Sequence, residues 1–358
     1  MRGTVWWAAG ATTWWAAGAT ALSVVACRSA DDLAVVDPDA ALDAGALHDG
    51  AFALTSIGPR QVATPEEEQA RAWIEAELRR IGLTDVVSEP FVFDAWRPGT
   101  ASVQVDREVL VEALSPSPAT ELTVRLADAS TGYAGAALLL PSTDGSRAEA
   151  FLTAIAGGAA ALIRVTEEID FDGSPLVEVG HLVDGTGLPA VAVDRGTGAW
   201  LADKLGQDVT LRIAPQVAVD HTSYNVVGRI PARDGSVEPG RVYVVAHYDS
   251  WHPSESAFDN ALGAAGLVRL AERALAAGTE PDRELVFLAT SGEEQGLRGS
   301  SAWVAAHAGE LGPADWVLVL DVMWSGEGSY LALGTDPGLR TDAIDAAAAE
   351  GLDAGDGG

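Results

Sequence analysis

The chain has 358 residues, enough for two domains or for one α/β domain that carries an insertion. Its formal net charge at pH 7 is -30 and Lys204 is its single lysine, which argues against nucleic acid or an anionic membrane surface as a partner, because both bind basic patches. The single cysteine, Cys27, excludes an internal disulfide framework and any zinc site built from several cysteines.

The N-terminal residues have the pattern of an export signal. Residues 4–26 are almost wholly apolar or small and end in SVVAC, where residues 24–27 resemble a bacterial lipobox, whose cysteine is lipidated after cleavage. We therefore expect residues 1–27 to be a signal peptide, and the protein to be a periplasmic or cell-surface lipoprotein anchored through Cys27 or, alternatively, a secreted protein. The apolar stretch is also just long enough for an uncleaved transmembrane anchor.

A linker and then a helix follow this segment. Residues 28–45 are polar and rich in Asp and Ala, which is typical of a linker. The stretch TPEEEQARAWIEAELRRIGL predicts a helix with Thr64 as N-cap, Pro65 at the first position, Glu67 completing a capping box and Gly82 beyond the end. The next stretch, VVSEPFVFDAW, predicts a strand.

Residues 103–222 have a different texture, with short β-type runs and two helical stretches near residues 146–156 and 195–205. This pattern predicts a separate small domain without catalytic residues of its own. The order strand, helix, GGAAALIRV, LPAVAVD, helix, strand resembles a protease-associated domain of the α+β class.

From residue 223 onward, apolar strands alternate with helices. The runs YNVVGRIP, RVYVVAH, RELVFLAT and DWVLVL are predicted strands, and residues 260–277 and 300–310 are predicted helices. Continuous apolar strands separated by helices predict an α/β fold with a mixed, mostly parallel sheet that carries helices on both faces. Sheets of this kind bind ligands at the carboxyl ends of their strands.

Polar residues gather at those strand ends. The strand tips and the loop after the first of them supply an imidazole and several carboxylates: His247, Asp249, Asp259, Glu293, Glu294 and Asp321. Such a set suits a two-metal hydrolytic site in which a carboxylate bridges two cations. One of the adjacent glutamates in TSGEEQGLRGS can then bind a metal while the other takes a proton from the attacking water. Asp249 lies on the same side of the extended chain as His247 and can orient its imidazole.

The segments HYDSW, AFDNALGAAGLVRLAERAL, TSGEEQGLRGSSAWV and LVLDVM, in this order, resemble the zinc aminopeptidases and carboxypeptidases of peptidase family M28, and SIGPRQVATPEEEQARAWIEAELRRIGL resembles that family's first helix. The resemblance implies two Zn2+ ions and hydrolysis of N-terminal residues or short peptides by metal-activated water. By position, it implies that His247 and Asp321 bind the first metal, that Asp259 bridges, that Glu294 binds the second metal, and that Glu293 is the general base. The inserted protease-associated domain is common in this family.

The chain departs from the family in one respect. The family supplies a further histidine to the second metal from a later loop, whereas this chain ends at residue 358 and has no histidine after His307. We therefore expect a truncated chain in which residues 46–102 and 223–358 form an incomplete peptidase domain, with residues 103–222 inserted. His307 itself is expected on a helix, solvated or packing, and not as a ligand.

Three alternatives to an active peptidase remain. The missing histidine favours a catalytically impaired binding or scaffold protein on the same fold. A glutaminyl-cyclase-like transferase fits less well, because those relatives use one metal and usually lack the equivalent of His247. A serine hydrolase is poorly supported, because the chain contains no G-x-S-x-G motif.

Overall fold

The computed structural model describes residues 44–322, except residues 84, 168–176, 178–179, 182–186, 237–239, 252–253 and 279. The expected signal peptide with Cys27 lies outside the described residues. The chain divides into two compact units: the first lies within residues 1–92, 222–293 and 297–358, and the second comprises residues 93–221 and 294–296. Among the helices of the described part, none is long and apolar enough to cross a membrane.

Ten strands are hydrogen-bonded in the order β1-β2-β6-β5-β4-β3-β7-β9-β8-β10. Two long strands, β1 (Val86–Gln104) and β7 (Asp208–Ile230), belong partly to each unit. The other strands of the first unit are β8 (Arg241–His247), β9 (Glu284–Thr290) and β10 (Trp316–Val319). Its helices are α1 (Ala44–Thr55), α2 (Pro65–Arg80), the short π-helix η1 (Ala257–Ala261), α5 (Leu262–Ala276) and α6 (Arg298–His307).

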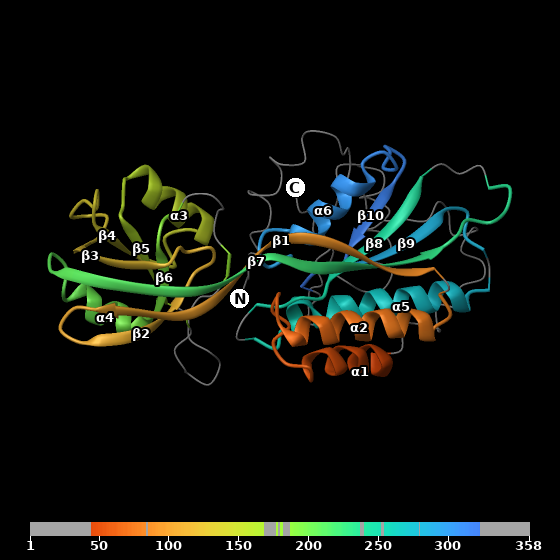
Figure 1. Ribbon diagram of the computed structural model, residues 1–358, viewed down its shortest axis with the longest axis horizontal. Helices are drawn as coiled ribbons and strands as arrows, with labels where there is room; N and C mark the ends of the chain where they lie inside the picture. Colours follow the sequence, from red (N-terminus) through yellow and green to blue (C-terminus); the bar gives the residue numbers. More distant parts are fainter. Residues whose placement is uncertain are drawn as a thin grey trace, which may run out of the picture. The chain divides into compact units, whose positions relative to one another are not determined.

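Helices cover both faces of the sheet in the first unit. β9, β8 and β10 pair in parallel, and β7 pairs with β9 in the antiparallel direction. In Figure 1, α1, α2 and α5 lie on one side of these strands and α6 lies on the other. Alternate residues of each strand face the two layers: Phe287 and Val244 pack with α2 and α5, whereas Val286 and Tyr243 pack with Trp303 of α6. The predicted mixed α/β sheet is therefore confirmed.

The start of α2 agrees with the sequence in most details. Thr64 is the N-cap, its side chain accepts a hydrogen bond from the backbone of Glu67, and Pro65 is the first helical residue. Gly82, with φ of +107°, follows the helix as predicted. One detail of the predicted capping box is wrong: the carboxylate of Glu67 accepts the N–H of Ala63 at 2.7 Å, where the sequence predicts that of Thr64.

In the second unit, four parallel strands lie between antiparallel ones. Its remaining elements are β2 (Glu108–Ala113), β3 (Thr120–Ala127), β4 (Ala137–Pro141), α3 (Arg147–Ala156), β5 (Ala161–Thr166), β6 (Ala190–Asp194) and α4 (Arg195–Ala202). β3, β4, β5 and β6 pair in parallel, while β2 pairs with β6 and β3 with β7 in the antiparallel direction. Leu138, Leu162 and Phe151 are fully or almost fully buried in its core.

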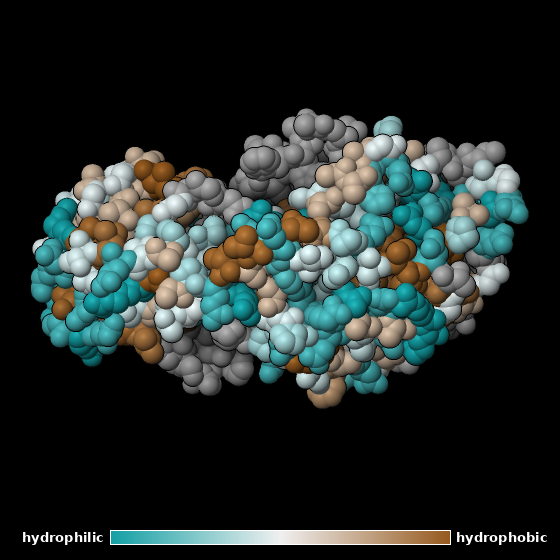
Figure 2. Space-filling model, viewed as in Figure 1, coloured by the Kyte–Doolittle hydropathy of each residue, from teal (hydrophilic) through white to brown (hydrophobic). Residues whose placement is uncertain are grey.

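Two elements lie where the sequence predicts none. α1 covers part of the first unit's core through Leu54. Its sequence is rich in alanine, and its apolar and polar residues do not recur with a clear helical period. β2 is short and has the exposed Leu110 in its middle, so that apolar and polar residues alternate only weakly along it. On the face shown in Figure 2, hydrophilic residues predominate and hydrophobic ones form separate small groups, in keeping with the acidic composition.

Candidate metal centre

The parallel pairing of β8, β9 and β10 brings three predicted segments to one edge of the sheet. β8 ends at His247, which lies beside Thr290, the last residue of β9. Asp321 comes two residues after the end of β10, whose residues pair in parallel with those of β8. Because the carboxyl ends of parallel strands lie at the same edge, residues far apart in the sequence meet there.

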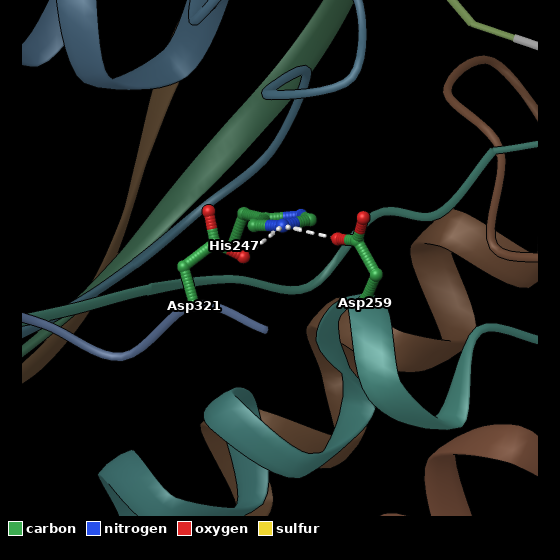
Figure 3. A group of neighbouring side chains, drawn as sticks. All are labelled: His247, Asp259 and Asp321. Carbon is green, nitrogen blue, oxygen red and sulfur yellow. Dashed lines mark hydrogen bonds and ion pairs between the residues drawn. The ribbon is translucent and has the colours of Figure 1, made fainter. Parts of the chain in front are cut away.

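His247, Asp259 and Asp321 form a compact group. The Nε2 atom of His247 is 3.1 Å from Oδ1 of Asp259 and 3.3 Å from Oδ1 of Asp321. Figure 3 shows the imidazole ring between the two carboxylates, Asp259 from η1 and Asp321 from the segment after β10. One ligand atom from each residue lies within 4.8 Å of the others, and within the described part of the chain this is the group of His, Asp and Glu side chains that could hold a metal ion.

The other ring nitrogen of His247 faces Asp249. Nδ1 is 3.2 Å from the backbone oxygen of Asp249 and 3.4 Å from its carboxylate, and the side chains of both residues are almost completely buried. Two acceptors at this nitrogen favour the tautomer with the proton on Nδ1, which leaves the lone pair of Nε2 for a metal. The predicted orienting role of Asp249 is consistent with this contact.

Charge around the imidazole is strongly negative. Burial disfavours the charged ring, but hydrogen bonds with Asp249, Asp259 and Asp321 outweigh burial and raise the pKa of His247 well above its usual value. A cation would relieve the repulsion among these carboxylates, whether it is a proton on the ring or a metal ion between the ligands.

The donor set fits zinc. Two ligands about 2.0–2.2 Å from a tetrahedral zinc ion are separated by about 3.3–3.6 Å, close to the 3.1 and 3.3 Å that separate Nε2 of His247 from the two carboxylate oxygens. One imidazole and two carboxylates are ligand types that zinc accepts, and catalytic zinc sites use three protein ligands with one position left for water or substrate. His247, Asp259 and Asp321 would hold the ion.

Buried polar contacts place the segment that carries Asp259. The next residue, Asn260, is fully buried and follows a cis peptide bond. Its amide donates to the carbonyl of Leu320 at 2.7 Å and accepts the N–H of Gly263 at 3.1 Å. Since Leu320 directly precedes Asp321, the side chain of Asn260 ties the two predicted aspartate ligands to each other.

Glu293 lies next to this group. Its Oε2 atom is 3.9 Å from Nε2 of His247, and its backbone N–H donates to the carboxylate of Asp249 at 3.2 Å. Burial raises the pKa of Glu293 to about 7, with His247 opposing the shift and Asp249 adding to it. A carboxylate with a pKa near neutrality can both accept and return a proton, which a general base requires.

The loop before Glu293 is held by a residue that the sequence assigns only to helix capping. The carboxylate of Glu67 accepts hydrogen bonds from the hydroxyls of Ser223 and Ser291, at 2.5 and 2.6 Å. The sequence does not indicate this contact, because the capping pattern already accounts for Glu67 and points to no distant serine. Glu294 is partly exposed and is not in the three-residue group, so its assignment to a second metal stays a prediction.

Comparison with known proteins agrees with this geometry. Residues 225–352 match the model of peptidase family M28. Aminopeptidase YwaD of Bacillus subtilis is 30% identical over 262 residues, which cover 70% of this chain; the chain spans about half, 54%, of that relative's length.

Solved structures give the same result. A zinc aminopeptidase from Bacillus subtilis is 26% identical with a TM-score of 0.64, over 79% of this chain and 70% of that one. The M28 peptidase precursor from Shewanella amazonensis SB2B, at 21% identity and a TM-score of 0.72 over 91% and 83% of the two chains, shares the fold. The chain is therefore similar to zinc aminopeptidases, and its residues 225–352 match the model of peptidase family M28.

Proposed function

We propose that this protein is a zinc-dependent exopeptidase of the aminopeptidase type, which removes N-terminal residues from peptides. The observation that carries the proposal is the group formed by His247, Asp259 and Asp321, with Glu293 beside it. The similarity to a zinc aminopeptidase from Bacillus subtilis supports the same substrate class.

Bound zinc would supply a Lewis acid that activates water and polarises the scissile carbonyl. Glu293, with a pKa near 7, accepts a proton from the attacking water and donates it to the leaving amine. Asp249 keeps the proton of His247 on Nδ1, so that Nε2 stays directed toward Asp259 and Asp321. The free amine of the substrate is recognised by acidic groups near this centre.

We further infer that a second zinc ion takes part, as the resemblance implies. Asp259 would bridge the two ions and Glu294 would bind the second one. Support for this comes from the carboxylate-rich surroundings of His247 and from the sequence motif around Glu294. Zinc stoichiometry of the folded chain, by metal analysis after dialysis, distinguishes one site from two.

The activity is tested with a peptide that has either a free or an acetylated N-terminus. We expect release of the N-terminal residue from the free peptide alone, and loss of both zinc binding and release in Asp259→Asn. Asp49→Asn is the control, because the side chain of Asp49 is 85% exposed on α1. Zinc binding without hydrolysis of either peptide would favour the alternative of a binding protein, and a chain that binds no zinc would contradict the proposal.

Two parts of the proposal rest on the sequence. We infer that residues 103–222 are a protease-associated domain, supported by the order of strands and helices there, and that Cys27 anchors an exported lipoprotein. The lipid anchor is tested by labelling cells with a fatty acid: we expect label in the parent protein and none in Cys27→Ala. Label that persists in the variant would exclude this cysteine as the anchor.

A further inference from the structure

Arg60 lies in the segment before α2, far in the sequence from the metal centre, and its side chain is fully buried. A buried guanidinium stays charged, so that hydrogen bonds must replace the water that it loses. Its Nε donates to the carbonyl of Tyr248 at 3.0 Å, Nη1 to Glu255 at 2.7 Å, and Nη2 to Ser256 at 3.1 Å. Nη1 also donates to the carbonyl of Leu54, at 3.3 Å.

These acceptors flank two of the predicted ligands. Tyr248 directly follows His247, and Ser256 precedes η1, the element that carries Asp259. A planar, rigid fork of donors that reaches both segments fixes the distance between them. The contact is thus placed to hold Nε2 of His247 and Oδ1 of Asp259 at their separation of 3.1 Å.

The backbone of Arg60 strengthens the same link. Its N–H donates to Oγ of Ser250 at 2.7 Å, and its carbonyl accepts the N–H of Ser250 at 3.2 Å. Ser250 follows Asp249, and its hydroxyl donates to the carbonyl of Ser254 at 3.3 Å. Both the main chain and the side chain of Arg60 therefore contact the loop between His247 and Asp259.

The loop needs such support at Ser256. This residue has φ of +45°, in the left-handed region, which is unfavourable for a residue with a side chain. The guanidinium of Arg60 binds the carbonyls on both sides of the Ser256 nitrogen, those of Glu255 and Ser256 itself. Hydrogen bonds from a charged donor are stronger than those from a neutral one, and they offset this backbone strain.

We propose that Arg60 is a positioning residue of the metal centre: its guanidinium clamps the backbone beside His247 to the backbone before Asp259 and so sets the ligand geometry for zinc. The part of this inference that concerns zinc rests on the proposed function; the part that concerns the loop does not. Arg60 lies outside the matched M28 segment, residues 225–352. It does lie in the stretch that resembles the family's first helix, but nothing in that stretch indicates a partner 188 residues away.

The experiment compares Arg60→Met with Arg164→Met in the full chain. Arg164 is a matched control, because it is also buried and also donates to backbone carbonyls, those of Ser142 and Gly145, but in the second unit. Hydrogen exchange without metal reports on the loop, and titration with zinc alone reports on the centre. We expect amides of residues 254–261 to exchange at least about 10-fold faster in Arg60→Met than in the parent, because local opening of the loop becomes easier. Arg164→Met should not change the exchange of these amides.

In the zinc titration we expect Arg60→Met to lose about 10–100-fold in affinity, and Arg164→Met to stay within about 2-fold of the parent. Arg60→Lys serves if the methionine variant does not fold: it restores the charge, but one ammonium cannot span the same carbonyls, so that zinc affinity stays at least about 5-fold low. Unchanged exchange of residues 254–261 in a folded Arg60 variant would overturn the clamp, and full recovery of both readouts by lysine would show a role of charge alone. A parent chain that binds no zinc would contradict the proposed function, while the exchange result would still decide for or against the clamp.

Discussion

Substitution of Gly263 by alanine tests how closely the two aspartate segments are packed. Gly263 is buried near the start of α5, and a Cβ atom there would lie 2.1 Å from Oδ1 of Asn260 and 2.4 Å from the carbonyl oxygen of Leu320. Both distances are far below van der Waals contact. Asn260 and the backbone that leads to Asp321 must therefore move apart, and the hydrogen bond between Asn260 and Leu320 must lengthen or break.

The expected cost follows from these contacts. Overpacking of a buried site costs about 1–3 kcal/mol, and loss of the two hydrogen bonds of Asn260 adds roughly 0.5–1.5 kcal/mol each. The gain in helix propensity from glycine to alanine offsets up to about 1 kcal/mol. We therefore expect a loss of roughly 1–5 kcal/mol in the free energy of unfolding, and a decrease of about 2–20 °C in the unfolding temperature of the first unit.

The assay is thermal unfolding of the chain with and without zinc, with Gly309→Ala as the matched control. An added Cβ at Gly309 meets no atom within 4 Å, so this variant should stay within about 0.5 kcal/mol of the parent. We also expect Gly263→Ala to bind zinc about 10-fold or more weakly, because Asp259 and Asp321 no longer keep their separation. Equal unfolding temperatures of the two alanine variants would refute the reasoning.

Glu293, the metal group and His307 each allow a further test. Glu293→Gln should retain zinc and lose roughly three or more orders of magnitude in turnover of a free peptide, since amide oxygen accepts no proton at neutral pH; near-normal turnover would contradict its role as general base. Zinc at about 100 times its dissociation constant should stabilise the parent by about 2.7 kcal/mol, an increase in unfolding temperature that chelation reverses and that Asp259→Asn lacks. Burial alone would lower the pKa of His307, but hydrogen bonds with Glu89 and Glu310 outweigh burial and raise it. These contacts therefore stabilise the fold at pH values below about 6.5, and the stabilisation disappears as the pH rises through the folded-state pKa. Unfolding measured from pH 6 to 9 should show the parent on the order of 0.5–1 kcal/mol more stable than His307→Gln at pH 6 and equal to it at pH 9; a constant difference would argue for packing on Trp303 alone.

The sequence predicts most elements of the first unit because their signals are local. The cap of α2 and the glycine beyond its end lie within a few residues of each other, and the apolar runs of β8 and β9 are continuous. α1 and β2 have no such local signal: α1 packs against α5, which is distant in the sequence, and β2 pairs with the distant β6 as well as with the neighbouring β1. Local propensity does not report on packing of that kind.

The candidate site follows the same division. Chain order and strand ends were enough to predict that His247, Asp259 and Asp321 meet, because parallel strands end at one edge of the sheet. The sequence could not predict the raised pKa of Glu293, since burial and the facing carboxylates are properties of the folded chain.

The sequence by itself determined which donor types stand at the strand tips, and with them the class of chemistry. Only the tertiary structure decided how the predicted ligands are held: Asn260 connects Asp259 to the segment after β10, and Arg60 contacts the backbone next to His247 and before Asp259. The physical reason is that hydrogen bonds to backbone carbonyls depend on where the chain passes and not on the identity of the residue that it passes. Hydrogen bonds of this kind therefore leave no recognisable pattern among the residues whose carbonyls accept them.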